Sequence, residues 1–210
     1  MRPEYKIKIC GIQSTETMDL CHSLGVDFVG LNFSPKSKRQ ISEDQIKNLL
    51  QKRESVNFPK VVFLFFENKE DQILHLTESY KPDFIQLITN DSYVPKYLFE
   101  NLYQKNMLLP SFRIQKPISN VDLGYPKLDL MILDSFETGE GGGTGKKFPW
   151  EFVKDVERNF LLAGGINEQN VTQALTETNA VGIDVASGVE TDGKKDPKKI
   201  KLLVENVRRL

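Results

Sequence analysis

Short apolar runs alternate with helical patterns along the whole chain. Eight runs rich in β-branched and aromatic residues begin 21 to 33 residues apart, which is about the length of one strand, one helix and two short loops. The predicted strands are Lys6–Cys10, Asp27–Asn32, Lys60–Phe65, Asp83–Leu87, Met107–Arg113, Asp129–Asp134, Phe160–Ala163 and Val181–Asp184. Regular alternation of strands and helices indicates an α/β fold with a parallel sheet. Eight such units predict a single-domain (β/α)8 TIM barrel over residues 1–210.

Helix signals occupy the segments between these runs. The start signals are Ser14, Ser42 with Gln45 as a capping box, Asn68, Asn167, and Asp196 with Pro197 at the first helical position. An open doubly wound sheet is the alternative architecture, but it usually has fewer strands, and "CGIQST" after the first run is not its glycine fingerprint. Pro110 weakens the fifth run, because proline cannot donate a ladder hydrogen bond.

The composition limits the classes of partner. With 28 basic and 29 acidic residues the net charge is −1, and no basic run is interleaved with aromatic residues, so a small local ligand is favoured over nucleic acid. The longest apolar run, Val61 to Phe66, is far too short to span a membrane. The N-terminus lacks the apolar core of a signal peptide, and two cysteines do not make a disulfide framework. We therefore expect free thiols and a cytoplasmic protein.

The residue at or next to the end of most predicted strands is polar or ionisable. These ends are Cys10, Asn32, Phe65, Gln86, Arg113, Asp134, Ala163 and Asp184. Because barrel enzymes carry their active sites at the C-terminal ends of the strands, we expect these side chains to share one polar pocket. Both histidines, His22 and His75, fall inside predicted helices. Acid–base chemistry would therefore come from Cys10, Asp134 or Asp184, whereas Cys21 fits the pattern of a small buried apolar residue.

Three loops at the same end carry further candidates. "AGGIN" after the seventh strand and "ASGVE" after the eighth contain Gly164, Gly165, Ser187 and Gly188, whose backbone N–H groups could bind phosphate. Gly-Gly is more often a simple turn, but both loops stand where this fold usually binds phosphate. The glycine-rich loop between Gly139 and Gly145 is either a linker or a loop that closes over substrate. The basic loop with Lys36, Lys38 and Arg39 is either solvated or a carboxylate clamp.

Seven short stretches spread over nearly the whole chain share one family pattern. They are "KICGI" at 8–12, "SPKSKRQIS" at 34–42, "QL" at 86–87, "LD" at 133–134, "GGTGK" at 142–146, "LAGGIN" at 162–167 and "DVASGVE" at 184–190. In this order they resemble the phosphoribosylanthranilate isomerases of tryptophan biosynthesis.

The resemblance implies a cofactor-free isomerase of the aldose–ketose type. It would convert N-(5-phosphoribosyl)anthranilate to 1-(2-carboxyphenylamino)-1-deoxyribulose 5-phosphate, the third step of tryptophan biosynthesis from chorismate, by an Amadori rearrangement. Cys10 would be the general base and Asp134 the general acid. Arg39 would face the anthranilate carboxylate, and Asp184 would contact the anthranilate amine or hold the site. The partner would be a small phosphosugar, with no metal, nucleic acid or membrane, and the protein would be a monomer or homodimer.

One departure and two alternatives accompany this resemblance. Ile88-Thr89 stand where the family usually has His-Gly, which removes a polar group near the aromatic part of the substrate. The related aminoaldose isomerase of histidine synthesis is one alternative, but it has aspartate in place of Cys10 and binds two phosphates, whereas one phosphate site is evident here. The other alternative is a noncatalytic phosphosugar-binding barrel.

Overall fold

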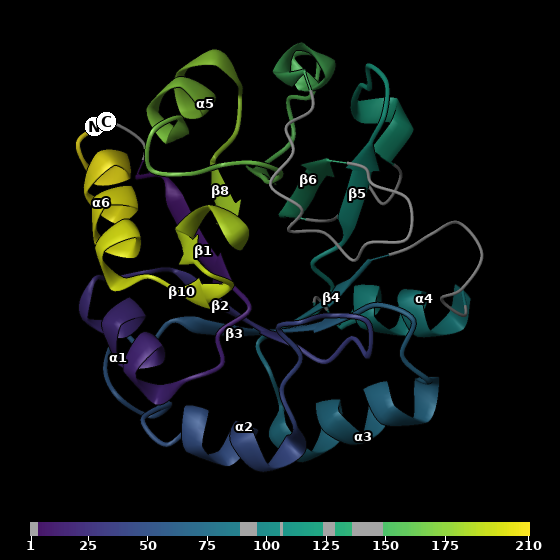
Figure 1. The fold of residues 1–210 in the computed structure, drawn as a ribbon. Helices are drawn as coiled ribbons and strands as arrows, with labels where there is room; N and C mark the ends of the chain where they lie inside the picture. Colours follow the sequence, from purple (N-terminus) through teal and green to yellow (C-terminus); the bar gives the residue numbers. More distant parts are fainter. Residues whose placement is uncertain (1–3, 89–95, 106, 124–128, 136–148) are drawn as a thin grey trace.

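Eight parallel strands form the centre of the molecule. The computed structural model describes residues 4–88, 96–105, 107–123, 129–135 and 149–210. The strands are β1 Lys6–Cys10, β2 Phe28–Asn32, β3 Lys60–Phe65, β4 Phe84–Leu87, β5 Ser111–Ile114, β6 Met131–Ser135, β7 Phe160–Leu162 and β8 Gly182–Val185. Their order in the sheet is β4-β3-β2-β1-β8-β7-β6-β5, and Figure 1 shows them surrounded by helices. The predicted (β/α)8 barrel is confirmed.

The barrel closes between β4 and β5 through isolated bridges. Ile85 pairs with Leu108, and Ile88 pairs with Ser111. Pro110 separates these two contacts, and β5 begins only after it. The predicted fifth strand, Met107–Arg113, is therefore divided at the proline, because a residue without an N–H group cannot continue the ladder.

In the described part of the chain, six α-helices and three 3-10 helices lie between or after the strands. They are α1 Thr15–Ser23, α2 Glu43–Leu49, α3 Glu70–Tyr80, α4 Lys96–Gln104, α5 Val171–Glu177, α6 Pro197–Arg208, η1 Asn120–Leu123, η2 Trp150–Val153 and η3 Ser187–Val189. In the β5–β6 and β6–β7 connections, the residues that the structure describes form 3-10 helices. Proline and glycine in these connections disfavour α-helix.

The N-terminal caps follow the sequence signals at three helices. The Ser14 hydroxyl accepts a hydrogen bond from the Thr17 N–H, and the Asp196 carboxylate accepts one from Lys198. Gln45 closes the capping box with Ser42. Asn68 and Asn167 do not cap α3 and α5, whose N-caps are Lys69 and Asn170. The Asn68 side chain instead bonds the backbone of Phe33 and Phe66, which ties two strand ends together.

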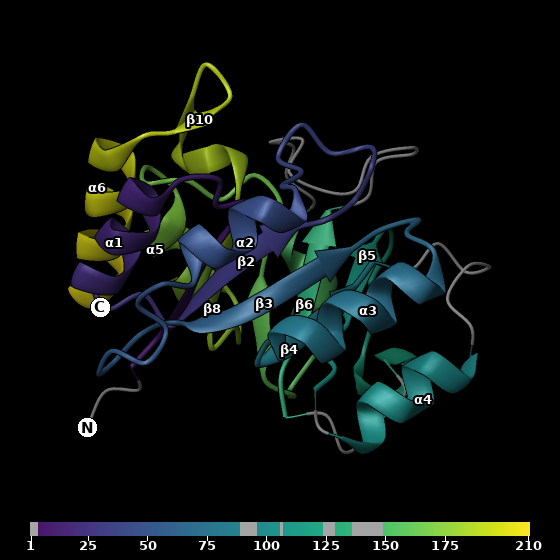
Figure 2. The same ribbon diagram turned by 90° about the horizontal axis from the view of Figure 1, so that it is seen from below.

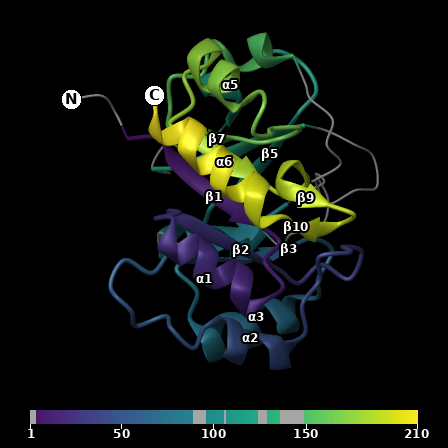
Figure 3. The ribbon, with the colours of Figure 1, turned by 60° about the vertical axis from the view of Figure 1, so that its left-hand side comes forward.

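Side chains alternate between two faces along every strand. Ile7 and Ile9 of β1 pack outward in the large core between sheet and helices, so Lys8 and Cys10 point into the barrel. A second, smaller cluster of buried apolar side chains is formed by Phe28, Val62, Leu109, Ile132, Leu161 and Ala163. Figure 3 shows α6 lying over β1 between α1 and α5. Among the described residues, none of the helices has the length and apolar character needed to span a membrane.

A two-stranded hairpin follows η3. Its strands, β9 Glu190–Thr191 and β10 Lys194–Lys195, are joined by Asp192 and Gly193, both with positive φ. Figure 2 shows this hairpin at the same end of the barrel as the loop between β2 and α2. Asp-Gly is a strong signal for a two-residue hairpin turn, so the sequence contained this element although no strand was predicted there.

Candidate active site

A pocket that is open to solvent lies at the C-terminal end of the barrel strands. All eight predicted site residues line it: Cys10, Arg39, Asp134, Gly164, Gly165, Asp184, Ser187 and Gly188. Asn32 and Gln86 also line it, as expected of polar strand ends. Phe65 does not belong to this group: it packs outward in the main core, and Leu64 faces the cavity instead. Neighbouring residues of a strand point to opposite faces of the sheet, so Leu64 and Phe65 cannot both face the cavity.

Cys10 ends β1 with its side chain beside Gly30 of β2. A methyl group on Gly30 would lie 2.7 Å from the Cys10 sulfur and 3.1 Å from its Cα, so the absence of a side chain there makes room for the thiol. Gly11 follows with φ +80, a conformation that favours glycine. The chain thereby turns away after Cys10, as the Gly11 and Ile12 N–H groups both donate to the Gly30 carbonyl.

The electrostatic surroundings of Cys10 act in opposite directions. Its side chain is buried, and burial raises the pKa of the thiol above its ordinary value. The charge of Lys8 lowers this pKa, that of Asp184 raises it, and the charges of Lys195 and Arg39 lower it again. Burial prevails, so the thiol form is favoured at neutral pH, while three cations surround any thiolate that forms.

Lys8 and Asp184 form an ion pair inside the barrel. The Lys8 ammonium lies 2.9 Å from a carboxylate oxygen of Asp184, and the Lys8 side chain is fully buried. Burial by itself lowers the pKa of Lys8, but the charges of Asp184 and Cys10 outweigh it and raise that pKa. Lys8 was not predicted as a site residue, although the period of two along a strand places it on the same face as Cys10.

Asp134 is the next-to-last residue of β6, and its carboxyl group accepts a hydrogen bond from the backbone of the following residue. One carboxyl oxygen accepts the Ser135 N–H at 2.7 Å. Burial and the charge of Asp184 raise the pKa of Asp134 to about 6, although the Ser135 N–H and Arg113 act in the opposite direction. A carboxyl group with such a pKa is a suitable general acid near neutral pH.

The two glycine loops after β7 and β8 pack directly against their neighbours. Gly164 and Gly165 have φ values of +83 and +68, and a methyl group on Gly164 would lie 2.6 Å from the Ser135 hydroxyl. A methyl group on Gly188 would strike the Ile166 carbonyl oxygen. The close backbone approach that glycine permits is what a site for an anion requires.

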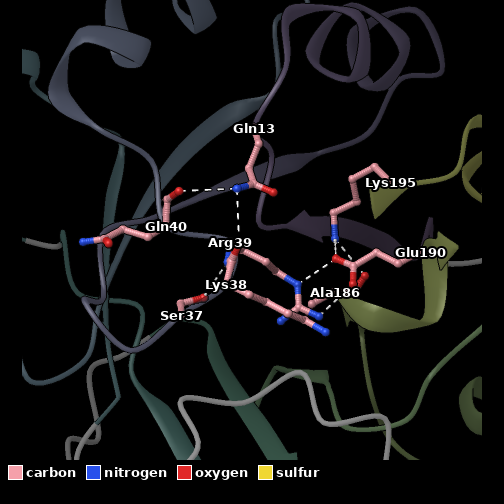
Figure 4. A network of polar contacts seen from close by, with 8 residues as sticks. All are labelled: Gln13, Ser37, Lys38, Arg39, Gln40, Ala186, Glu190 and Lys195. Atoms are coloured by element: carbon pink, nitrogen blue, oxygen red, sulfur yellow. Dashed lines mark hydrogen bonds and ion pairs between the residues drawn. The ribbon is translucent and has the colours of Figure 1, made fainter. Parts of the chain in front are cut away.

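Arg39 lies at the cavity wall with its guanidinium group bound to Glu190 (Figure 4). Its Nε and Nη2 atoms donate to the two carboxylate oxygens of Glu190 at 2.7 and 2.8 Å. Lys195 donates to the same carboxylate at 2.7 Å. Arg39, the residue expected to bind a ligand carboxylate, is therefore already bound to a carboxylate of the protein itself. Glu190 and Lys195 were not predicted as functional residues.

Other candidates fall elsewhere. Lys36 and Lys38 are exposed, as the solvated alternative predicted, and His22 and His75 lie away from the cavity in α1 and α3. Cys21 is fully buried, and burial raises its pKa to about 12. The Gly139–Gly145 loop and Thr89 lie outside the described residues, whereas Ile88 lines the cavity. Within the described ranges no group of three or more His, Cys, Asp or Glu residues could hold a metal ion.

Comparisons with known proteins agree on one family. The family model described as N-(5'phosphoribosyl)anthranilate (PRA) isomerase matches residues 7–206. The N-(5'-phosphoribosyl)anthranilate isomerase of Leptospira borgpetersenii serovar Hardjo-bovis (strain JB197) is 42% identical over 209 residues, covering 97% of this chain and 94% of the relative. That of Thermoanaerobacter sp. (strain X514) is 34% identical over 208 residues, covering 97% and 98%.

Solved structures show the same similarity. The phosphoribosyl anthranilate isomerase of Thermotoga maritima matches with a TM-score of 0.79 and 29% identity over 98% of this chain and all of that one. Another structure of such an isomerase holds reduced 1-(o-carboxyphenylamino)-1-deoxyribulose 5-phosphate and matches with a TM-score of 0.76 and 26% identity, covering 98% of this chain and 100% of that one.

Removal of the buried cation should strongly destabilise the barrel. In Lys8→Met, Asp184 loses its cation while staying buried, and we expect the free energy of unfolding to fall by about 3–5 kcal/mol. Lys6→Met is the matched control, because the Lys6 side chain is 44% exposed where it pairs with Asp27, and its loss should stay below about 1 kcal/mol. Urea unfolding measures both. Equal, small losses would contradict the importance of the pair.

A methyl group on Gly30 should compete with the Cys10 thiol for the same space. Gly30→Ala should lower the free energy of unfolding by about 1–3 kcal/mol through overpacking. In a Cys10→Ala background the same change should cost much less, because the sulfur is gone. A double-mutant cycle by urea unfolding measures the coupling. Additive effects would show that the two side-chain positions are independent.

Proposed function

The chain belongs to the N-(5'-phosphoribosyl)anthranilate isomerase family, and we propose that it rearranges N-(5-phosphoribosyl)anthranilate to 1-(2-carboxyphenylamino)-1-deoxyribulose 5-phosphate with Cys10 and Asp134 as the reacting groups. The observation that carries the residue assignment is that one cavity collects both groups together with both glycine loops. Cys10 and Asp134 stand on β1 and β6, which are separated by β8 and β7 in the sheet. A substrate between them can therefore meet an acid and a base from different sides.

The reaction begins with opening of the ribose ring. Protonated Asp134 gives its proton to the ring oxygen, the bond between that oxygen and C1 breaks, and the anthranilate nitrogen forms a Schiff base with C1. A pKa of about 6, raised by burial and by Asp184, leaves an appreciable fraction of Asp134 protonated near neutral pH. With the ordinary pKa of an aspartate, a far smaller fraction of Asp134 would be protonated at this pH.

The second half of the reaction moves a proton from C2 to C1. The Cys10 thiolate removes the C2 proton, and the electron pair of that bond neutralises the iminium nitrogen, which gives an enolamine. Loss of the C2 hydroxyl proton and gain of a proton at C1 complete the ketone and return both groups to their starting states. Three positive charges, those of Lys8, Lys195 and Arg39, lower the pKa of the Cys10 thiol and so favour the thiolate, which burial disfavours.

The remaining site residues bind the substrate. Gly164, Gly165, Ser187 and Gly188 would hold the phosphate through backbone N–H groups, Arg39 would face the anthranilate carboxylate, and Asp184 would lie near the anthranilate amine. The cavity wall at Ile88 is apolar, which suits the face of an aromatic ring. A relative's complex with a reduced product analogue supports a phosphosugar ligand.

We further propose that the protein acts in the cytoplasm as a monomer or homodimer. Both cysteines are unpaired thiols, which suits a reducing compartment. One solved relative, from Thermotoga maritima, is described as a dimeric isomerase that was converted to monomers. Sedimentation at micromolar concentration distinguishes the two states.

Loss of either reacting group should abolish most of the turnover. We expect Cys10→Ala and Asp134→Asn each to lower kcat by at least about 10²- to 10⁴-fold with the fold intact. The decay of fluorescent phosphoribosylanthranilate measures the rate. Cys21→Ala is the matched control and should keep near-normal kcat, since Cys21 is buried away from the cavity. Near-normal rates in either active-site variant would refute its role, and an inactive, folded wild-type protein would refute the function.

The pH dependence should report the two protonation states. The active form needs protonated Asp134 and ionised Cys10, and burial raises both pKa values. We expect kcat/KM to rise with pH up to about 6, to stay level up to the pKa of Cys10, and to fall above it. In Asp134→Asn the inflection near 6 should disappear. Its persistence would assign it to the substrate phosphate, which also titrates near 6.

A further inference from the structure

The guanidinium group of Arg39 is held by a carboxylate of its own chain. A guanidinium group offers N–H donors on more than one edge. Glu190 occupies the edge formed by Nε and Nη2, at 2.7 and 2.8 Å. A ligand carboxylate cannot use this edge while Glu190 is there, so it meets the guanidinium group only in the orientation that Glu190 sets. The ion pair thus determines which part of Arg39 can meet a ligand.

The rest of Arg39 is fixed as well. Its N–H donates to the Ser37 hydroxyl at 3.1 Å. The Gln13 amide donates to the carbonyl groups of Lys38 and Gln40 on either side of it (Figure 4). A methyl group on Gly11 would strike the Arg39 Cδ, so the aliphatic stem lies directly on the backbone after β1. These contacts hold the backbone and the aliphatic carbons of Arg39 in place, and Glu190 fixes the orientation of its guanidinium group.

Glu190 is itself placed by the hairpin. It pairs with Lys195 across β9 and β10, and the Lys195 ammonium bonds both the Glu190 carboxylate and the Ala186 carbonyl at 2.7 and 2.8 Å. Lys199 of α6 donates to the Glu190 backbone carbonyl. The side chains of Arg39, Glu190 and Lys195 are almost entirely buried. With two cations and one carboxylate, the cluster keeps a net positive charge at the cavity wall.

We propose that Glu190 is a positioning residue that holds Arg39 in the orientation required to recognise the carboxylate of the substrate, with Lys195 holding Glu190. This rests on the function proposed above. A purely structural ion pair would stabilise the fold and affect all ligands alike. A positioning role instead predicts that loss of Glu190 weakens ligands with a carboxylate more than ligands without one.

The test compares two ligands that differ only in the carboxylate. Titration calorimetry gives the Kd of reduced 1-(o-carboxyphenylamino)-1-deoxyribulose 5-phosphate and of its phenylamino counterpart, which lacks the carboxylate. In Glu190→Gln the side chain keeps its size, but its amide places a donor against a guanidinium donor. We expect the preference for the carboxylate ligand to fall by about 10- to 100-fold, with little change for the counterpart.

Two further variants separate geometry from charge. Glu190→Gln with Lys195→Met keeps the net charge of the cluster, and it should still lose the preference if orientation is what matters. Glu205→Gln, at a carboxylate on α6 that pairs with Arg209, is 56% exposed and should change nothing. Recovery of the preference in the charge-matched double variant would overturn the proposal, as would equal weakening of both ligands in Glu190→Gln.

Tighter binding of the carboxylate ligand in Glu190→Gln would also overturn the proposal, because it would show that Glu190 competes with the ligand for Arg39. Failure of the proposed function gives a different result. A wild-type protein that neither binds the reduced product analogue nor turns over phosphoribosylanthranilate refutes the isomerase, whereas normal wild-type behaviour with an unchanged preference in Glu190→Gln refutes only the positioning role.

Discussion

The buried ion pair between Lys8 and Asp184 is the interaction on which the site depends. The two residues stand opposite each other in the register of β1 and β8. Either charge alone inside the barrel would cost several kcal/mol, so the pair favours this register over any shifted one. The same ammonium lowers the pKa of Cys10, and the same carboxylate raises the pKa of Asp134. One contact therefore links the alignment of two strands to the protonation states of both proposed reacting groups.

Burial helps one of the two proposed reacting groups and hinders the other. For Asp134 it favours the protonated form that the proposed acid needs, whereas for Cys10 it disfavours the thiolate that the proposed base needs. The cavity compensates only on the side of the base, where Lys8, Lys195 and Arg39 surround the thiol. Glu190 moderates this positive charge by binding two of the three cations. Because the pKa of Cys10 stays above that of Asp134, the form with protonated Asp134 and ionised Cys10 is a minor one at neutral pH.

Local sequence patterns predicted the frame and the positions of the site residues. Alternation and caps placed the strands, and the rule that barrel sites lie at strand ends led to Cys10 and Asp134 before any contact was known. The contacts that tune these residues could not be predicted in this way. Glu190 meets Arg39 across 151 positions of sequence, and Gly30 matters only because it is the neighbour of Cys10 across a strand pair. Such partners depend on the register of the barrel, which no single segment encodes.

The hairpin that carries Glu190 has a consequence for the order in which the site can be completed. Cys10, Lys8 and Arg39 belong to the first fifth of the chain, but their charged partners are Asp184, Glu190 and Lys195. During synthesis the early residues emerge long before these partners, so a nascent barrel that lacks the last strand and hairpin would bury unpaired charges. The pairing of β8 with β1 therefore also completes the site, because β8 and the hairpin supply the carboxylates that bind Lys8 and Arg39.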